Sequence, residues 1–186
     1  MNGLFITKIL FVMLSSLENS NNYIHFNKNY VYEYEKHFKD GRWWKEYTMV
    51  EDTLYQNNMI YYGMFTRKYS PQGEIISKLY YRIDEVQNYL VLNEINNKEY
   101  LIFSSQAIEA QKFPLKSIYL QYNLEILSNT AIIETPSGKY SNLMELSVNN
   151  GASFMYFKHN LGLVAIKENN TIVYFLRHYD LYNTTR

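Results

Sequence analysis

Residues 30–38 read Tyr-Val-Tyr-Glu-Tyr-Glu-Lys-His-Phe, and residues 117–127 read Ser-Ile-Tyr-Leu-Gln-Tyr-Asn-Leu-Glu-Ile-Leu. In both stretches apolar or aromatic side chains take most of the even positions, and polar side chains take most of the odd ones. Because a β-strand sends successive side chains to opposite faces, this period of two predicts strands with one buried face. Tyrosine, isoleucine, valine and phenylalanine also suit a pleated sheet.

Turn signals separate the predicted strands. Asp40-Gly41 and Asn150-Gly151 are the strongest, because a two-residue hairpin loop requires positive φ angles. Asparagine pairs and proline-containing turns are further signals, at residues 57–58, 71–73, 96–97, 136–138 and 169–170. Strands joined by such short loops must be antiparallel neighbours, since a parallel pair needs a long crossover.

The sequence therefore predicts an all-β fold, an antiparallel meander of about 11–12 strands curled into a barrel, half-barrel or sandwich. Residues 104–116 depart from the alternation and contain helix-compatible residues before Pro114. A short helix or an irregular crossover fits there, and we expect at most one or two short helices in the chain.

The chain of 186 residues has no stretch with the composition of a flexible linker, so residues 21–186 are predicted to form a single β-rich domain. Residues 1–20 differ from the rest: Lys8 precedes an apolar run at residues 9–14, and polar residues follow. This pattern is typical of a short secretory signal, with a first core strand or buried helix as the alternative. A membrane-spanning helix needs about 20 apolar residues, so this segment is too short. We expect export to the periplasm or cell envelope.

Composition disfavours several classes of function. Lysine plus arginine and aspartate plus glutamate balance at 18 each, so no net charge attracts nucleic acid. The absence of cysteine excludes disulfides and thiolate zinc sites, and the four histidines lack metal-ligand spacing, so we expect no metal or cofactor. Phosphate-binding loops and nucleophile elbows are also missing from the sequence. A non-catalytic protein is favoured.

Aromatic residues, with 20 Tyr, 10 Phe and 2 Trp, suit either cross-strand packing or a binding surface. The alternation assigns five large side chains to one face of the first hairpin, namely Tyr32, Tyr34, Trp43, Tyr47 and Met49. Bulky residues on the facing strands would overfill a closed core. These five residues are therefore the candidate ligand-binding set, lining a gap suited to an acyl chain or similar apolar molecule.

The last third of the chain carries a further pattern. Thr135-Pro136-Ser137-Gly138-Lys139-Tyr140 is followed by Tyr156-Phe157-Lys158 and then by Leu161-Gly162-Leu163-Val164. This resembles the "TPxGxF … YYAxGxGLV" pattern of uncharacterised exported bacterial proteins with lipoprotein-carrier-like antiparallel sheets. It departs from that pattern at Lys158-His159-Asn160, where the family usually has a small residue. The resemblance implies a fold and an envelope location, and no catalytic residues.

Two hypotheses about function follow. The first is an exported binding module whose curved sheet holds a lipid or another apolar or amphipathic molecule. The second is a structural or protein-interaction domain of the cell envelope, with an envelope protein as partner and a core filled by side chains. An enzyme is the least favoured. The first two differ in whether the interior keeps an accessible apolar cavity.

Overall fold

The structure is a computed structural model that describes residues 14–15, 25–26, 30–70, 73–104, 106–116 and 121–181. The predicted signal segment at residues 1–20 lies outside the described residues, except for Leu14 and Ser15. The strands, in chain order, are β1 (Leu14–Ser15), β2 (His25–Phe26), β3 (Tyr30–His37), β4 (Trp43–Gln56), β5 (Met59–Ser70), β6 (Gly73–Ile83), β7 (Asn88–Asn93), β8 (Lys98–Ser104), β9 (Lys112–Lys116), β10 (Gln121–Thr135), β11 (Gly138–Val148), β12 (Ser153–Lys158), β13 (Gly162–Glu168) and β14 (Thr171–Leu181).

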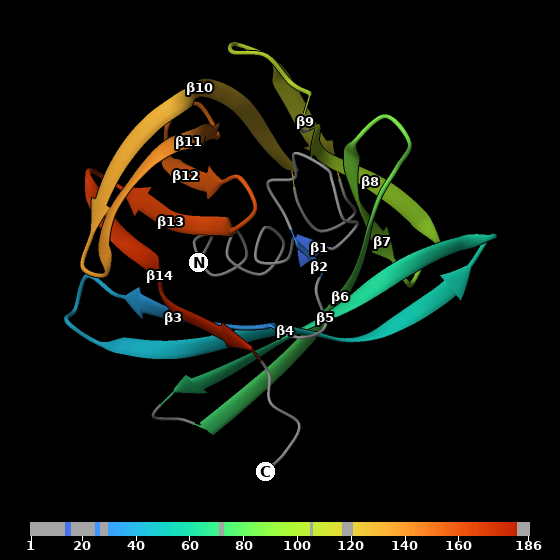
Figure 1. The fold of residues 1–186 in the computed structure, drawn as a ribbon, viewed down its shortest axis with the longest axis horizontal. Helices are drawn as coiled ribbons and strands as arrows, with labels where there is room; N and C mark the ends of the chain where they lie inside the picture. The colour runs from blue at the N-terminus through green and yellow to red at the C-terminus, as the bar shows by residue number, and fades with distance from the viewer. Residues whose placement is uncertain are drawn as a thin grey trace.

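Twelve of these strands form a single antiparallel sheet, in the order β8-β7-β6-β5-β4-β3-β14-β13-β12-β11-β10-β9. Each strand pairs with its neighbour in the chain except at one place, between β8 and β9. Strands β3 and β14, which come first and last of these twelve in the chain, pair with each other. Some Cα atoms of β8 and β9 lie within 8 Å, so the sheet curls into a nearly closed barrel (Figure 1). The all-β barrel prediction is confirmed. The short strands β1 and β2 pair separately, in parallel.

Asparagine pairs form two of the tight turns of the barrel. Asn57-Asn58 and Asn169-Asn170 are two-residue loops in which all four residues have φ between 48° and 64°. Asparagine accepts this left-handed conformation more readily than most residues. The Asp40-Gly41 and Asn150-Gly151 signals mark longer loops, at residues 38–42 and 149–152, whose glycines have φ of 83° and 91°. The positions of these two glycine turns were predicted correctly, but their two-residue length was not.

The interior of the barrel contains one large apolar cluster. It includes Tyr34, Met64, Phe103, Leu124 and Phe157, each at most 2% exposed. In β10 the even residues Tyr122, Leu124 and Ile126 are buried, as the alternation predicted. Ile118 and Leu120, also assigned to this face, lie outside the described residues.

Residues 104–116 have no helix among those described, which include every position there except 105. Ala107 and Gln111 donate backbone hydrogen bonds that form two successive turns, and β9 follows. Of the two alternatives for this stretch, the structure has the irregular connection. Pro114 lies inside β9, an edge strand, where its missing N–H leaves no hydrogen bond of the ladder unmade.

Candidate functional site

The five residues of the candidate ligand-binding set lie on two faces of the sheet. Tyr32 pairs with Thr48, and Tyr34 pairs with Glu46; both tyrosines are buried in the interior. Trp43, Tyr47 and Met49 point outward, and Trp43 is 53% exposed. The assignment of all five to one face is therefore wrong.

The reason is the length of the first loop. His37 pairs with Trp43, so the loop contains the five residues 38–42. A two-residue loop at Asp40-Gly41 would instead have paired Tyr34 with Tyr47 and Tyr32 with Met49. A shift of one residue in register moves a whole strand's side chains to the other face. In consequence β4 turns Trp44, Glu46 and Thr48 inward.

A charged cluster results inside the barrel, near the end that carries this loop. Glu46 is fully buried, and its Oε1 atom accepts hydrogen bonds from Lys68 Nζ at 2.6 Å and Trp44 Nε1 at 3.0 Å. Its Oε2 atom accepts a hydrogen bond from the Tyr174 hydroxyl at 3.4 Å. Strands β4, β5 and β14 thus meet at one carboxylate. Buried charges are tolerated when they are paired and hydrogen-bonded in this way.

Lys36 adds a second ammonium group to the cluster. Its register partners are Trp44 on β4 and Tyr174 on β14, and it is 8% exposed. Its Nζ atom lies 5.9 Å from the Trp44 ring centroid and 5.5 Å from that of Phe38. The Nζ atom of Lys68 lies 5.8 Å from the Trp44 ring. Two cations therefore pack against one indole, a geometry in which the electron-rich face of the ring attracts them.

The electrostatics of the cluster reflect this crowding. Burial lowers the pKa of Lys36, the Glu46 carboxylate opposes that shift, and the charge of Lys68 adds to it. Burial also raises the pKa of Tyr174 and of Tyr34 well above the usual value, and Glu46 contributes in both cases. The tyrosines are therefore neutral hydrogen-bond donors at pH 7.

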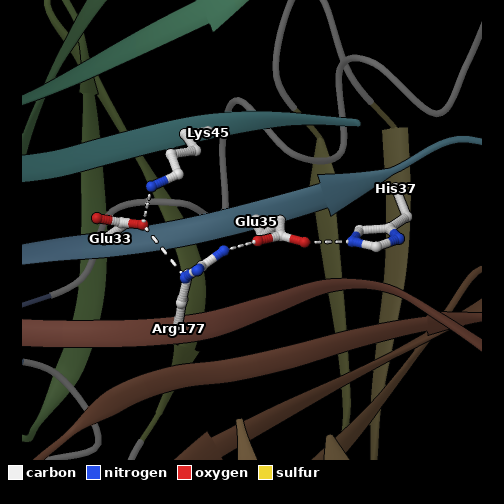
Figure 2. A network of polar contacts seen from close by, with 5 residues as sticks. All are labelled: Glu33, Glu35, His37, Lys45 and Arg177. Carbon is white, nitrogen blue, oxygen red and sulfur yellow. Dashed lines mark hydrogen bonds and ion pairs between the residues drawn. The ribbon is translucent and has the colours of Figure 1, made fainter. Parts of the chain in front are cut away.

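A second polar network lies on the opposite, outer face of β3, where it crosses three strands (Figure 2). Lys45 Nζ on β4 lies 2.7 Å from Glu33 Oε1, and Arg177 on β14 contacts both Glu33 and Glu35. His37 Nε2 lies 2.6 Å from Glu35 Oε1. Partial burial alone would raise the pKa of Glu35, but hydrogen bonds from His37 and Arg177 and the charge of Arg177 hold it below its usual value. This network ties β14 to β3 and β4.

The carboxylates of the two networks are held by ion pairs and hydrogen bonds. Glu33 forms ion pairs with Lys45 and Arg177, and Glu35 forms one with Arg177. Across the described ranges, no group of three or more histidine, aspartate or glutamate side chains is placed to hold a metal ion. Those ranges also hold no helix long and apolar enough to cross a membrane.

Sequence reasoning missed the inner cluster. Lys36 occupies an even position of β3, among the tyrosines that the alternation assigned to the buried face. A lysine on a face otherwise expected to be buried was the available signal. Glu46 and Lys68 offered none, because only the register of β3, β4 and β5 turns both inward.

Two solved structures are similar to this chain. One, from Parabacteroides distasonis ATCC 8503, is described as a "putative lipoprotein"; it is 10% identical, with a TM-score of 0.51 over 88% of this chain and 100% of that one. The other, from Bacteroides fragilis NCTC 9343, is described as a "putative exported protein with YmcC-like fold"; it is 9% identical, with a TM-score of 0.51 over 83% and 96%. At identities this low, the structural similarity shows a shared fold and nothing further. No protein-family profile and no curated protein matches the chain.

Proposed function

We propose that this protein is an exported, non-catalytic barrel of the cell envelope that holds a protein partner on its outer surface. The observation that carries the proposal is the filled interior. Large side chains, among them Tyr81, Tyr89 and Phe103, are at most 1% exposed and belong to a single apolar cluster with residues from both halves of the sheet. A barrel filled in this way acts through its exterior.

The exterior offers a surface for this role. Trp43, Tyr69 and Ile76 are 53%, 47% and 52% exposed, on the outer face of β4, β5 and β6. The strand register makes Tyr69 a diagonal neighbour of both Trp43 and Ile76, and its ring lies 5.7 Å from that of Tyr47. We call these four residues the outer patch. Contiguous exposed apolar side chains are typical of protein-binding surfaces.

Export is supported by the signal-like pattern at residues 1–20 and by the fold shared with the two proteins described as exported or as a lipoprotein. Intact-mass measurement and cell fractionation of the protein from its native host test this part. We expect a chain shortened by about 16–20 residues, the length of a short signal, in the envelope fraction. Full-length protein in the cytoplasm would contradict export.

The partner is tested by photo-crosslinking in the native host. A benzoylphenylalanine at position 69, in the outer patch, should give one discrete protein adduct. The same residue at position 132, which is 61% exposed on β10, serves as the control. No adduct at position 69, or the same adducts from both positions, would contradict the proposal. Native mass spectrometry should also find no stoichiometric lipid in the isolated protein.

A further inference from the structure

Strand β6 has an unpaired edge near the turn that joins it to β5. It pairs with β5 from Gly73 to Tyr81, whereas β7 pairs only with residues 80–83 of β6. Among the described residues, no strand pairs with the other side of residues 74–79, which we call the open edge. This end of the β5–β6 hairpin projects from the wall of the barrel (Figure 1, lower left). Backbone groups that face away from β5 can pair there with an added strand.

The side chains of the open edge favour such an addition. Glu74, Ile75 and Ile76 are all exposed, the two isoleucines by 46% and 52%, although successive residues point to opposite faces. Residues 74–79 contain no proline, a residue that blocks pairing at many edge strands, whereas the edge strand β9 contains Pro114. An added strand would cover apolar side chains on both faces.

The sequence of the open edge is complementary to itself. Glu74, Ile76 and Lys78 share one face of β6, because alternate residues of a strand point to the same side. In an antiparallel pair of two β6 strands with Ile76 opposite Ile76, Glu74 of each copy lies opposite Lys78 of the other. A shift of two residues in either direction sets Ile76 opposite a charged residue instead. Apolar pairs and opposite charges directly across two strands are favourable.

We propose that two copies of this chain pair through the open edge, antiparallel, with Ile76 of each copy at the two-fold axis. The charges already have partners within the chain: Glu74 lies 3.7 Å from Arg67, and Lys78 pairs with Asp52. The pairs between copies therefore fix the register more than they add affinity. Because the contact is only a short strand on each side, the dimer is reversible.

The dimer has a consequence for the outer surface. Pairing through β6 joins the two sheets into one, and places the outer faces of β4, β5 and β6 from both copies side by side. Ile76 belongs to the outer patch, so the two patches become one continuous surface. The inference goes beyond the proposed function, because the open edge pairs whether or not another protein binds the patch.

A single introduced cysteine tests the register, because the chain has none of its own. Ile76→Cys in the full chain should form a disulfide between two copies under mild oxidation, since directly opposite residues have Cα atoms about 4.5–5.5 Å apart. Ile132→Cys, at a position 61% exposed on β10, is the matched control and should stay monomeric. Electrophoresis without reducing agent measures both. No disulfide at position 76, or equal disulfide formation in the two variants, would overturn the proposed register.

Analytical ultracentrifugation of the unmodified full chain, over a series of concentrations, measures association directly. The mass should rise from that of one chain toward that of two. Ile76→Lys should weaken association at least tenfold, because it sets two ammonium groups opposite each other. Ile132→Lys should leave it unchanged, and circular dichroism would check that both variants are folded. A monomer at every concentration, or association that Ile76→Lys does not weaken, would overturn the dimer.

Exchanging the charges tests their pairing between copies. Glu74→Lys and Lys78→Glu should each associate more weakly than the parent, because each sets like charges opposite each other. An equal mixture of the two variants should associate at least tenfold more tightly than either alone, since every opposed pair is then of opposite charge. A mixture no tighter than its components would overturn the pairing of Glu74 with Lys78. Peptides of the crosslinked adduct at position 69 identify a second copy or another protein, so the dimer and the proposed partner fail separately.

Discussion

The two runs of strands, β3–β8 and β9–β14, meet at two places. These two places differ in how the strands are joined. At the seam, β3 and β14 pair along their length, from Tyr174↔Lys36 to Leu181↔Tyr30. At the junction, β8 and β9 lie near each other, but the described residues form no ladder between them. The seam joins the two ends of the described barrel sequence, whereas the junction lies between consecutive strands.

The seam is reinforced on both faces. Inside, Tyr174 donates a hydrogen bond to Glu46, and the Tyr34 hydroxyl donates one to the Leu163 carbonyl oxygen at 3.1 Å. Outside, Arg177 bridges to Glu33 and Glu35 (Figure 2). The junction is closed by side chains: Phe103 lies 5.5 Å from Phe157, and Ala107 and Phe113 are buried in the same cluster.

The difference shows where polar interactions are concentrated. The seam strands are far apart in the chain, so their pairing incurs a large loop-closure entropy before its contacts form. Directional hydrogen bonds and ion pairs fix the register there. The junction strands are held close by a short connection, and apolar packing suffices.

The largest expected effect is on how readily the sheet opens locally at the seam and at the junction. Backbone amides bonded between β3 and β14 should exchange with solvent hydrogen only on global unfolding, at a cost of about 5–15 kcal/mol. Amides of β8 that face the junction should exchange at a small fraction of that cost. Hydrogen exchange followed by mass spectrometry measures both. Equal protection of the two sets would remove the distinction between seam and junction.

Glu46→Gln should weaken the seam from inside. The substitution leaves the Lys68 ammonium buried without its carboxylate, which costs about 3–5 kcal/mol. The free energy of unfolding in urea measures the loss. Glu74→Gln, on the outer face beside Arg67, is the control and should cost less than about 1 kcal/mol. Similar values for the two variants would show that Glu46 does not hold the cluster.

Gly41→Val should disturb the loop that turns Lys36 and Glu46 inward. Gly41 has a φ of 83°, which a β-branched residue adopts only under strain, although a side chain would meet nothing within 4 Å. We expect a cost of about 1–3 kcal/mol in the same urea measurement. Lys39→Val, in the same loop, should stay within about 0.5 kcal/mol of the parent. If Gly41→Val cost as little as Lys39→Val, the positive φ of Gly41 would not be what makes glycine necessary in this loop.

The smallest expected effect concerns the outer network. The pKa of Glu35 is lower in the folded chain than its usual value of 4.5, so ionised Glu35 stabilises the fold above that pH. This contribution disappears as the pH falls through the folded-state pKa. Glu35→Gln should therefore cost up to about 1 kcal/mol at pH 7 and almost nothing near pH 2.

Urea unfolding of parent and variant at both pH values measures this dependence. Glu85→Gln, at an exposed position of the β6–β7 loop, is the control and should change stability at neither pH. A cost for Glu35→Gln that persists undiminished at pH 2 would show that the ionised carboxylate is not its source.

The sequence predicted the architecture well because that architecture depends on local signals. The alternation in residues 30–38 and 117–127 identified strands, and the asparagine and glycine pairs marked where they end. Strands joined by short loops can only form an antiparallel meander, and so long a meander curls into a barrel or sandwich. These features follow from residues that are close together in the sequence.

The site could not be predicted because it depends on register and on long-range pairing. Two and five residues are both plausible loop lengths around Asp40-Gly41, yet they place Tyr47 and Glu46 on opposite faces. The lysines and the carboxylate come together through the registers of β3, β4 and β5, and Tyr174 joins them through the pairing of β3 with β14. The sequence by itself determined which residues form strands and turns. The tertiary structure decided which side chains face the interior, because burial belongs to the assembled barrel and not to any single strand.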